Sequence, residues 1–408
     1  MERKILIEKR ENRIRTFFLE DGDIVEIHSA AEEAAGIGSH RLGDVYVGKV
    51  RNIVPNIGAA FIEIEKGVNC YYDMKDAENS FFTHKSGKKA LCIGDELVVQ
   101  ISREAVKTKA ATVTGSISFT GRYAVLTHGN TRIGVSSKIP KSLKDEYKER
   151  LSGFQNDRYG IIVRTNAKDV PFQDVLDEIN SLKEEYEALF QTASTRKCFS
   201  CLKSAPPSYI LDLKNVYMEG MKEIIIGDKG LYTRIQSYFR AELPDKLSLL
   251  KLYDDPSFPL DKLYSTQTIL EKALRERAWL KTGGYLIIQP TEALTVIDVN
   301  SGKAAAKAGS RTQSEDGAMK VNLEAAREAA KQIRLRNLSG IIIIDFINMG
   351  SEENTQQLLH EFRFYLSKDP IQTSLVDMTP LGLVEVTRKK VRRPLYEEEN
   401  YLSFRKLH

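Results

Sequence analysis

Two carboxylates and an amide stand at the ends of apolar runs in the C-terminal part of the chain. The stretch LTVIDVNSGK leads an apolar run into Asp298 and places Asn300 two residues further on. Residues two apart in a strand share a face, with Cα atoms about 6.5 Å apart, so these two side chains would point the same way. A second apolar run, residues 341–344, ends in Asp345. Because sites in α/β sheets gather outside strand ends, we expect the three side chains to lie close together.

Such a group of side chains is typical of a metal site. An ionised carboxylate beside an apolar core is costly unless its charge is compensated, and a hard divalent cation would compensate it. Two aspartates, one amide oxygen and water molecules suit Mg²⁺, or Mn²⁺ in its place, better than zinc. The alternative is that Asp298 and Asp345 only cap the helices that follow them. The Ser-Gly-Lys at the end of the stretch is not a phosphate loop, because Ile297 and Ala304 stand where that motif needs glycine and Ser or Thr.

Aromatic and basic residues are interleaved in a second region, residues 43–119, where short strands punctuated by glycine predict a small β-barrel or sandwich. The candidates are Phe61, Tyr71 or its neighbour Tyr72, and Lys109. Rings beside positive charge are how OB-type barrels hold single-stranded nucleic acid. Each ring taken alone is more often a core residue. Together with a metal site, the combination indicates a nuclease.

A basic cluster and a cysteine pair allow two interpretations each. The stretch TRKKVRRPL, residues 387–395, is either a solvated helix face or a contact with a phosphate backbone. Cys198 and Cys201 form half of a zinc knuckle, but no second CxxC pair completes four ligands in one chain. We therefore expect reduced thiols and no zinc, with a zinc ion shared between two chains as the alternative.

Length and composition limit the class of protein. A chain of 408 residues predicts two to four folding units. A hydrophobic fraction of 42% and a charged fraction of 28% are ordinary for globular proteins and exclude a fibrous or disordered chain. No apolar stretch approaches the roughly 20 residues that span a bilayer, and the N-terminus lacks the apolar core of a signal peptide. We expect a cytoplasmic protein without a membrane partner.

Hydrophobic periodicity predicts the main elements. In the first half we expect a hairpin around Asp21-Gly22-Asp23, and a helix over 170–194 with apolar residues at helical spacing. Pro206-Pro207 marks a plausible boundary. In the second half we expect a helix over 266–284, closed by two glycines, and then strands alternating with helices up to residue 379. This order predicts an α/β layout with buried strands.

These stretches resemble a known family, the bacterial ribonuclease E/G endoribonucleases. TEALTVIDVNSGK, VNLEAAREAAKQIRLRNLSGIIIIDFINM and MTPLGLVEVTRKK are similar to its nuclease core. GDVYVGKV and GAAFIEI are similar to its OB-type RNA-binding insert, and GIIVRT to its phosphate-sensing segment. The similarity extends over nearly all of the chain and is greatest to a short, ribonuclease G-like member.

The resemblance implies an α/β multidomain fold. An RNase H-like domain would be interrupted by an OB-fold RNA-binding insert and a 5′-sensor module, and a DNase I-like α/β nuclease domain would follow. The implied bounds are 1–36 and 208–280 for the two parts of the RNase H-like domain, 37–120 for the OB-fold domain, 121–207 for the 5′-sensor domain and 281–408 for the DNase I-like catalytic domain.

The resemblance also assigns roles. Asp298 and Asp345 match the metal-ligating aspartates, and Asn300 matches the asparagine that assists them.

Five further residues match positions that contact RNA. Phe61, Tyr71 and Lys109 match the clamp on the substrate strand, with Tyr71 where phenylalanine is more usual. Arg164 and Thr165 match the pair that binds a 5′-monophosphate. An Arg-Thr pair after a strand is by itself only a weak phosphate motif.

The implied function is a Mg²⁺-dependent endoribonuclease acting on single-stranded RNA, in rRNA maturation or mRNA decay. It would leave 5′-phosphate products and would be stimulated by a 5′-monophosphate. The alternative is a catalytically inactive RNA-binding protein that acts on transcripts or ribosomal precursors. A nuclease for DNA is disfavoured only by the resemblance, because none of these residues identifies a 2′-hydroxyl.

The sequence departs from the family pattern in three places. Asn348 stands where the family usually has aspartate, which lowers the negative charge near the metal. No cysteine follows TRKK, where the family has a CPxC motif that shares zinc between subunits, and the sequence ends without the family's small C-terminal dimerisation domain. A homodimer remains one of the candidate partners, but we do not expect it to form through the family's zinc-link motif.

Overall fold

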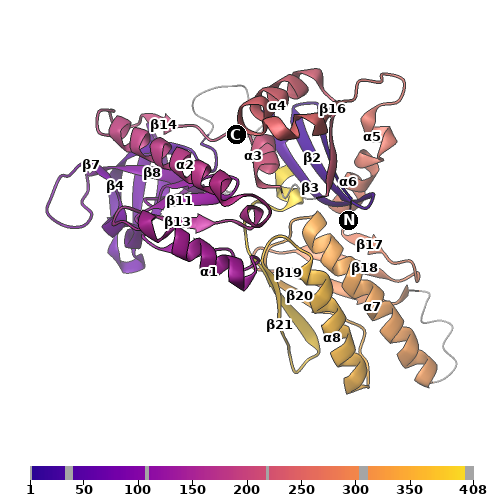
Figure 1. Cartoon of the computed structure of the whole chain (residues 1–408). Coiled ribbons are helices and arrows are strands. Elements are labelled where there is room, and N and C mark those ends of the chain that lie inside the picture. The colour runs from indigo at the N-terminus through magenta and orange to yellow at the C-terminus, as the bar shows by residue number, and fades with distance from the viewer. Residues whose placement is uncertain (1, 33–39, 106–109, 217–219, 303–310, 400–408) are drawn as a thin grey trace. The chain divides into compact units, whose positions relative to one another are not determined.

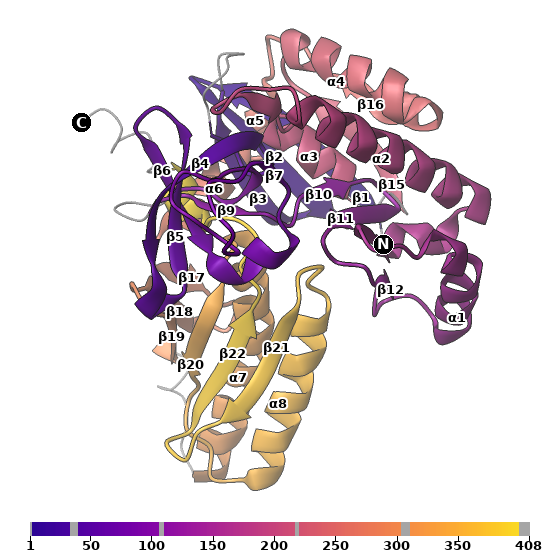
Figure 2. The same ribbon diagram turned by 90° about the vertical axis from the view of Figure 1, so that its left-hand side faces the viewer.

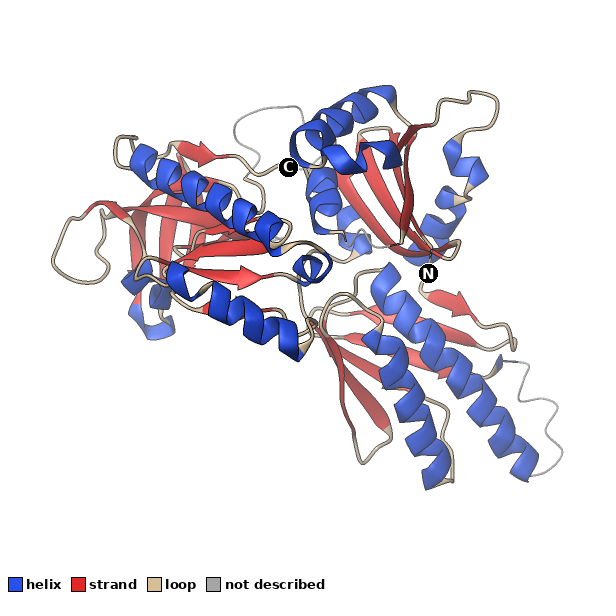
Figure 3. Cartoon of the chain, in the orientation of Figure 1, coloured by secondary structure: helices blue, strands red, loops and turns tan. Residues whose placement is uncertain are grey.

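The computed structural model describes residues 2–32, 40–105, 110–216, 220–302 and 311–399 (Figure 1). The chain divides into two compact units. Unit 1 comprises Met1–Glu32 and Glu219–His408, and unit 2 comprises Glu33–Met218. Each unit contains both helices and sheets (Figure 3), so the expected mixed α/β fold is confirmed at this level.

The N-terminal strands of unit 1 form a five-stranded sheet in the order β16-β15-β1-β2-β3. β1, β2 and β3 are antiparallel, whereas β15 and β16 continue the sheet in parallel from β1. The predicted hairpin is confirmed: Asp21 and Gly22 have φ angles of 48° and 90°, as a type I′ turn requires. The strands are β1 (Arg3–Arg10), β2 (Arg13–Glu20), β3 (Asp23–Ala31), β15 (Met221–Ile226) and β16 (Leu250–Leu252). The helices nearby in the chain are α4 (Lys229–Glu242), α5 (Leu260–Leu263) and α6 (Thr266–Leu274).

The second sheet of unit 1 has six strands in the order β17-β18-β19-β20-β22-β21. Only β19 and β20 run parallel to each other. The strands are β17 (Arg277–Trp279), β18 (Tyr285–Pro290), β19 (Thr295–Asn300), β20 (Gly340–Asp345), β21 (Thr373–Met378) and β22 (Leu383–Arg388). Helices α7 (Arg311–Leu335) and α8 (Glu352–Ser367) lie side by side on one face (Figure 1).

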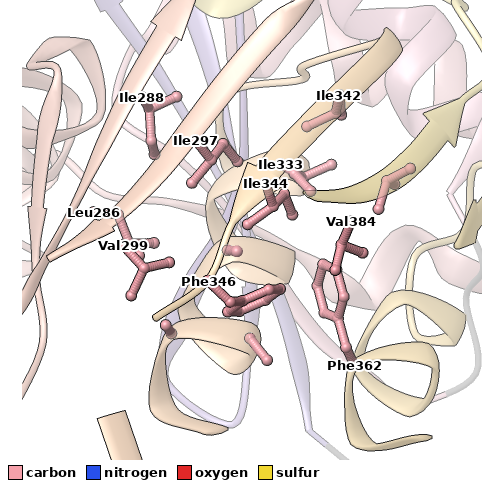
Figure 4. Packing of buried hydrophobic residues seen from close by; sticks show 14 of the residues in the cluster. Leu286, Ile288, Ile297, Val299, Ile333, Ile342, Ile344, Phe346, Phe362 and Val384 are labelled. Carbon is pink, nitrogen blue, oxygen red and sulfur yellow. The ribbon is translucent and has the colours of Figure 1, made fainter. Parts of the chain in front are cut away.

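The core of this sheet lies under the two helices. Ile297, Ile344 and Val384 from three strands pack with Phe362 of α8 (Figure 4), and all four are fully buried. Alternate residues of each strand face away from the helices and are half-buried or exposed, as Ile341 is at 50%. The sheet therefore has one face that forms the core and one face with more accessible side chains.

The predicted helix over 266–284 is wrong in its second half. Helix α6 ends at Leu274, and residues 277–279 form β17, paired antiparallel with β18. Ala278 packs into the core, while Arg277 and Trp279 are exposed. This alternation has the period of a strand, and Gly283 and Gly284 lie in the connection between β17 and β18 instead of ending a helix.

Five strands of unit 2 close into a small barrel in the order β4-β5-β6-β9-β8, with β8 pairing back to β4 (Figure 2). β6 and β9 are parallel, and the other neighbours are antiparallel. A barrel was one of the two predicted forms, and it is confirmed. The strands are β4 (Val45–Val54), β5 (Ala59–Glu65), β6 (Val68–Asp73), β8 (Glu96–Arg103) and β9 (Thr112–Thr114), with β7 (Phe82–His84) and β14 (Cys201–Lys203) added outside the ring.

The rest of unit 2 is a four-stranded sheet in the order β10-β11-β13-β12. The predicted long helix is confirmed as α2 (Phe172–Ala193), whose apolar stripe is buried against β10 and β11. The remaining elements are β10 (Ser118–Thr120), β11 (Ala124–His128), β12 (Ile133–Val135), β13 (Tyr159–Val163), α1 (Lys141–Arg150) and α3 (Ser208–Asn215). Helix α3 begins directly after the predicted boundary at Pro206-Pro207, but unit 2 continues to residue 218. The division into four domains, one of them in two parts, stays a prediction.

No helix within the described ranges is both long enough and apolar enough to cross a bilayer.

Candidate active site

The parallel pair β19 and β20 brings Asp298 and Asp345 side by side. The register pairs Asp298 with Asp345 and Ile297 with Ile344. Neighbouring strands lie about 4.8 Å apart, so the side chains of the two aspartates extend from adjacent positions of the sheet. Ile297 and Ile344 face the helices and are fully buried (Figure 4), which directs the aspartates to the opposite, accessible face of the sheet.

Asn300 lies on the same face, as its spacing predicts, and contacts the first aspartate. Its Nδ2 donates a hydrogen bond of 2.7 Å to Oδ2 of Asp298. This bond fixes one carboxylate oxygen and leaves the amide oxygen of Asn300 as an acceptor. Asp298 and Asn300 are half-buried, and Asp345 is exposed.

The alternative that the aspartates are helix caps is not supported. Ser351 caps α8, and its side chain accepts a hydrogen bond of 3.2 Å from the backbone N–H of Asn354. Asp345 is the last residue of β20, and Asp298 lies within β19. Neither carboxylate is positioned at the first turn of α7 or α8.

The oxygen atoms at this edge fit a hard cation. The described ranges contain no cluster of three or more His, Cys, Asp or Glu side chains that could enclose a metal ion. Two carboxylates with room for water are nevertheless how proteins hold Mg²⁺, which keeps several waters and is completed by substrate phosphates. The donor set therefore suits Mg²⁺ or Mn²⁺ and does not resemble a closed structural zinc site.

A residue that sequence analysis missed holds the segment after Asp345. Asn322 of α7 is fully buried. Its side chain donates a hydrogen bond of 2.8 Å to the carbonyl of Ile347 and accepts one of 3.0 Å from the backbone N–H of the same residue. This pair of bonds ties the loop that carries Asn348 to the helix. The sequence held one indication of this role, because Asn322 adjoins Val321 on the apolar stripe of α7. A polar side chain buried there needs a hydrogen-bond partner.

Phe61 and Tyr71 are neighbours on the barrel. They are register partners on β5 and β6, with ring centroids 6.4 Å apart and planes at 88°. Both are half-buried, whereas Ile62 and Tyr72 point into the barrel core and are fully buried. The structure thus separates Tyr71 from its alternative, Tyr72. Lys109 lies outside the described residues.

Arg164 and Thr165 directly follow β13. Nη1 of Arg164 donates a hydrogen bond of 2.6 Å to the carbonyl of Gly121, and Nη2 donates one of 2.9 Å to Oδ1 of Asn215. Burial lowers the pKa of Arg164, and the negative charge of Glu178 opposes this shift. Thr165 shares a hydrogen bond of 2.8 Å with the hydroxyl of Ser136.

Glu178 of α2 is a second residue that sequence analysis missed. Its carboxylate accepts hydrogen bonds from three consecutive backbone N–H groups, at 2.6 Å from Arg122, 2.6 Å from Tyr123 and 2.9 Å from Ala124. These bonds fix the turn that follows Gly121 and so the carbonyl that Arg164 contacts. Nothing in the spacing distinguished Glu178 from the other acidic residues of a polar helix.

The cysteine pair lies beside the barrel. Sγ of Cys198 is 3.9 Å from the carbonyl of Val47, and Sγ of Cys201 is 3.6 Å from Oγ of Ser204. Burial raises the pKa of Cys198 to about 11, which favours the neutral thiol. The expectation of no zinc stays a prediction.

The basic cluster is not a helix face, and its first member is not a phosphate contact. Arg388 ends β22, is 2% exposed, and donates hydrogen bonds to Asp369 at 2.7 Å and to the carbonyl of Leu338 at 3.1 Å. Lys389 and Lys390 are exposed in the loop that follows. The hypothesis of a phosphate contact therefore applies only to the members after Arg388.

Comparisons with known proteins agree on one family. A model of the Ribonuclease E/G family matches residues 118–391. Ribonuclease E of Synechocystis sp. is 33% identical over 377 residues, covering 90% of this chain and 55% of its own length. Ribonuclease G of Salmonella typhimurium is 30% identical over 406 residues, covering 96% of this chain and 81% of its own length. Ribonuclease G of Escherichia coli strain K12 is 29% identical, covering 97% and 81%. The chain thus spans only a little over half the length of the ribonuclease E relative.

Proposed function

Since the chain belongs to the ribonuclease E/G family, we propose that it is an endoribonuclease that cleaves single-stranded RNA with the help of Mg²⁺, or of Mn²⁺ in its place. The observation that carries the proposal is the register pair of Asp298 and Asp345 on the accessible face of the sheet. We extend the proposal to cleavage in rRNA maturation or mRNA decay, in the cytoplasm.

We propose different roles for the three residues at the strand ends. Asp298 and Asp345 would hold the cation, and Asn300 keeps one oxygen of Asp298 in place through its hydrogen bond. A divalent cation bound there supplies positive charge for the phosphate and lowers the pKa of water. The side chains orient the phosphodiester for hydrolysis, which leaves 5′-phosphate and 3′-hydroxyl ends.

The barrel supports an RNA clamp. Its strand order supports an OB-fold, a barrel in which the second and third strands and the connection between the last two bind single strands. Phe61 and Tyr71 lie on those two strands, and Lys109 falls in the sequence between the end of β8 and the start of β9, outside the described residues. We propose that the two rings stack on bases and that Lys109 contacts the backbone.

The structure also supports two other proposals, an RNase H-like domain and a 5′-monophosphate site. The N-terminal sheet, in which three antiparallel strands are extended by two parallel ones, supports an RNase H-like domain. Arg164 and Thr165 offer a guanidinium and a hydroxyl at adjacent positions, which supports a 5′-monophosphate site that stimulates cleavage.

The test uses a labelled single-stranded oligoribonucleotide with Mg²⁺, with EDTA, and with the variants Asp298→Asn and Asp345→Asn. We expect EDTA to abolish cleavage and each variant to slow it by roughly 100-fold or more. Gln357→Ala, on the exposed surface of α8, is the control and should cleave normally. Cleavage that persists in EDTA or in both variants would overturn the proposed mechanism.

The same experiment separates the alternatives. RNA binding without cleavage in either metal would favour a catalytically inactive RNA-binding protein, an alternative supported by Asn348, which stands where the family usually has aspartate. Equal cleavage of a matched oligodeoxyribonucleotide would show a nuclease without preference for RNA.

A further inference from the structure

An exposed aromatic group lies on the same sheet as the aspartates. Trp279, the single tryptophan of the chain, is 65% exposed, although tryptophan is on average a highly buried residue. It pairs across β17 and β18 with Tyr285, at 5.3 Å between ring centroids and 61° between planes. The guanidinium of Arg277 lies 4.4 Å from the Tyr285 ring centroid and 5.4 Å from that of Trp279. We call these three side chains the aromatic platform.

The aromatic platform faces the same way as the candidate active site. Tyr285 is the register partner of Asn300, so Trp279, Tyr285 and Asn300 form one row across three strands. The next row contains Arg277, Ile287, Asp298 and Asp345. Two strand spacings, about 10 Å, separate Trp279 from Asn300. β17, β18 and β19 follow one another in the sheet (Figure 1), so the rows are continuous.

The residues between those of the aromatic platform fix its orientation. Ala278, Leu286 and Val299 belong to the core under the helices, which requires their neighbours in the strands to face the opposite side. Leu286 and Val299 are seen in that core in Figure 4.

The connection that follows Trp279 is held rigidly. The carboxylate of Glu324 on α7 accepts hydrogen bonds from the backbone N–H groups of Lys281 and Thr282. The backbone of Gly284 packs so closely on β19 that an added Cβ would lie 2.7 Å from the carbonyl oxygen of Asn300. The aromatic platform is therefore preorganised relative to the end of β19.

We propose that the aromatic platform is a nucleotide subsite, in which Trp279 stacks on a base of the single-stranded RNA that flanks the phosphate at Asp298 and Asp345. The inference rests on the proposed function and adds a binding site to it. Base–aromatic stacking needs only an accessible ring face, which Trp279 has, and tolerates any base. Arg277 supplies a cation for the adjacent phosphate and holds Tyr285 by its position over the ring.

A nucleotide suits the position better than a protein partner does. The aromatic platform is small, carries a positive charge, and continues directly into the row of residues that would handle a phosphate. The alternative, that Trp279 and Tyr285 form only a cross-strand pair that stabilises the hairpin, predicts no dependence on RNA.

The first measurement uses the single tryptophan as a reporter. In an Asp298→Asn background, which is expected to slow cleavage strongly, a short oligoribonucleotide is titrated while tryptophan fluorescence and the anisotropy of a labelled RNA are recorded. We expect Trp279 fluorescence to be quenched with the same Kd that anisotropy gives. Binding by anisotropy with unchanged tryptophan emission would overturn the subsite, as would the absence of any RNA binding.

The second measurement uses variants in the same background. Trp279→Leu keeps apolar bulk without a ring face and should raise Kd about 10-fold, while Trp279→Phe should recover most of the affinity. Phe364→Ala is a matched control, because Phe364 is 54% exposed on α8 with the ammonium of Lys368 at 4.6 Å from its ring centroid, and it should bind normally. Thermal melting checks that each variant is folded. Unchanged Kd in folded Trp279→Leu would leave only the hairpin-stabilising role.

The third measurement locates the base. A set of oligoribonucleotides, each with one abasic nucleotide, is compared between the background protein and Trp279→Leu. One position beside the cleavage site should weaken binding to the background protein about 10-fold and have little further effect in Trp279→Leu. Additive losses at every position would exclude a stacked base at Trp279. These three measurements record RNA binding, whereas the proposed function is tested by cleavage with the wild-type chain. A failure of the subsite can therefore be distinguished from a failure of the proposed function.

Discussion

The amide of Asn300 decides how Asp298 presents its carboxylate. A hydrogen bond to an ionised group contributes about 1.5–3 kcal/mol net, more than a bond between neutral groups. Without it, the side chain of Asp298 would be free to turn away from Asp345, its partner across the parallel strands.

We therefore predict that Asn300→Ala slows RNA cleavage by roughly 10- to 100-fold and raises the Mg²⁺ concentration needed for half-maximal rate. The measurement is a Mg²⁺ titration of the cleavage rate, with Gln357→Ala as the control. A variant with the wild-type rate and the wild-type titration would show that the 2.7 Å bond to Asp298 has no functional role.

For Arg388 we predict an effect on stability, because this charged side chain is buried. It is paired with Asp369, and the two side chains are 0% and 6% exposed. Removing one partner of a buried ion pair leaves an uncompensated charge and costs about 3–5 kcal/mol. Arg388→Met should lower the urea midpoint markedly, while Lys390→Ala, an exposed neighbour, should change stability by no more than about 0.5 kcal/mol. A stable Arg388→Met variant that binds RNA weakly would instead restore the phosphate-contact hypothesis.

These residues show what local sequence could and could not predict. The shared face of Asp298 and Asn300 follows from the period of a strand, and the proximity of Asp345 follows from where apolar runs end. The burial of Arg388 depends on a partner on a different element, Asp369, which no local pattern in TRKKVRRPL could identify. The same is true of Asn322 and the carbonyl it contacts.

At the scale of elements, errors arose where a short strand follows a helix directly. The run from 266 to 279 is rich in helix-forming residues, and a three-residue alternation is too short to outweigh them. Only pairing with β18 makes 277–279 a strand. For this reason the shared face of Arg277 and Trp279 could not be predicted, whereas the 22 residues of α2 gave a clear helical period.

The junction of β1 with α6 predicts a dependence of stability on pH. Glu8 of β1 accepts a hydrogen bond from the hydroxyl of Thr266, the first residue of α6. Burial raises the pKa of Glu8 to about 7, and the nearby Asp261 adds to the shift. The folded state therefore binds more protons than the unfolded chain between about pH 4.5 and pH 7, so the stability from this group is complete below pH 4.5 and is lost as pH rises through 7.

We predict that Glu8→Gln removes this loss. The variant should match the wild type near pH 5 and exceed it by roughly 2–3 kcal/mol at pH 8. Urea unfolding at the two pH values measures the difference, and Glu242→Gln, at an exposed position of α4, should retain the wild-type pH dependence. A Glu8→Gln variant less stable than the wild type at pH 8 would contradict the raised pKa.

At the scale of the whole molecule, the residues with proposed functions are divided between two units. The residues proposed to hold the metal, Asp298 and Asp345, are in unit 1, and the proposed clamp and 5′-phosphate residues are in unit 2. Strand patterns were sufficient to predict a small barrel or sandwich and the α/β sheet. They could not place the end of unit 2 at residue 218, because α3 after Pro207 has no feature that assigns it to either neighbour.

This division leads to the prediction for Arg164. If Arg164 contacts the 5′-monophosphate, it acts in unit 2 on a part of the RNA that is not cleaved, so its loss should affect only substrates that carry this group. Arg164→Ala should slow cleavage of a 5′-monophosphorylated oligoribonucleotide about 10-fold and leave the 5′-hydroxyl form unchanged. Asn215→Ala removes one of the contacts of Arg164 but keeps the guanidinium, and should retain most of the preference for the monophosphate. Arg196→Ala, an exposed arginine after α2, should behave as the wild type, and equal slowing of both substrates by Arg164→Ala would assign Arg164 to the structure of unit 2 and not to a phosphate site.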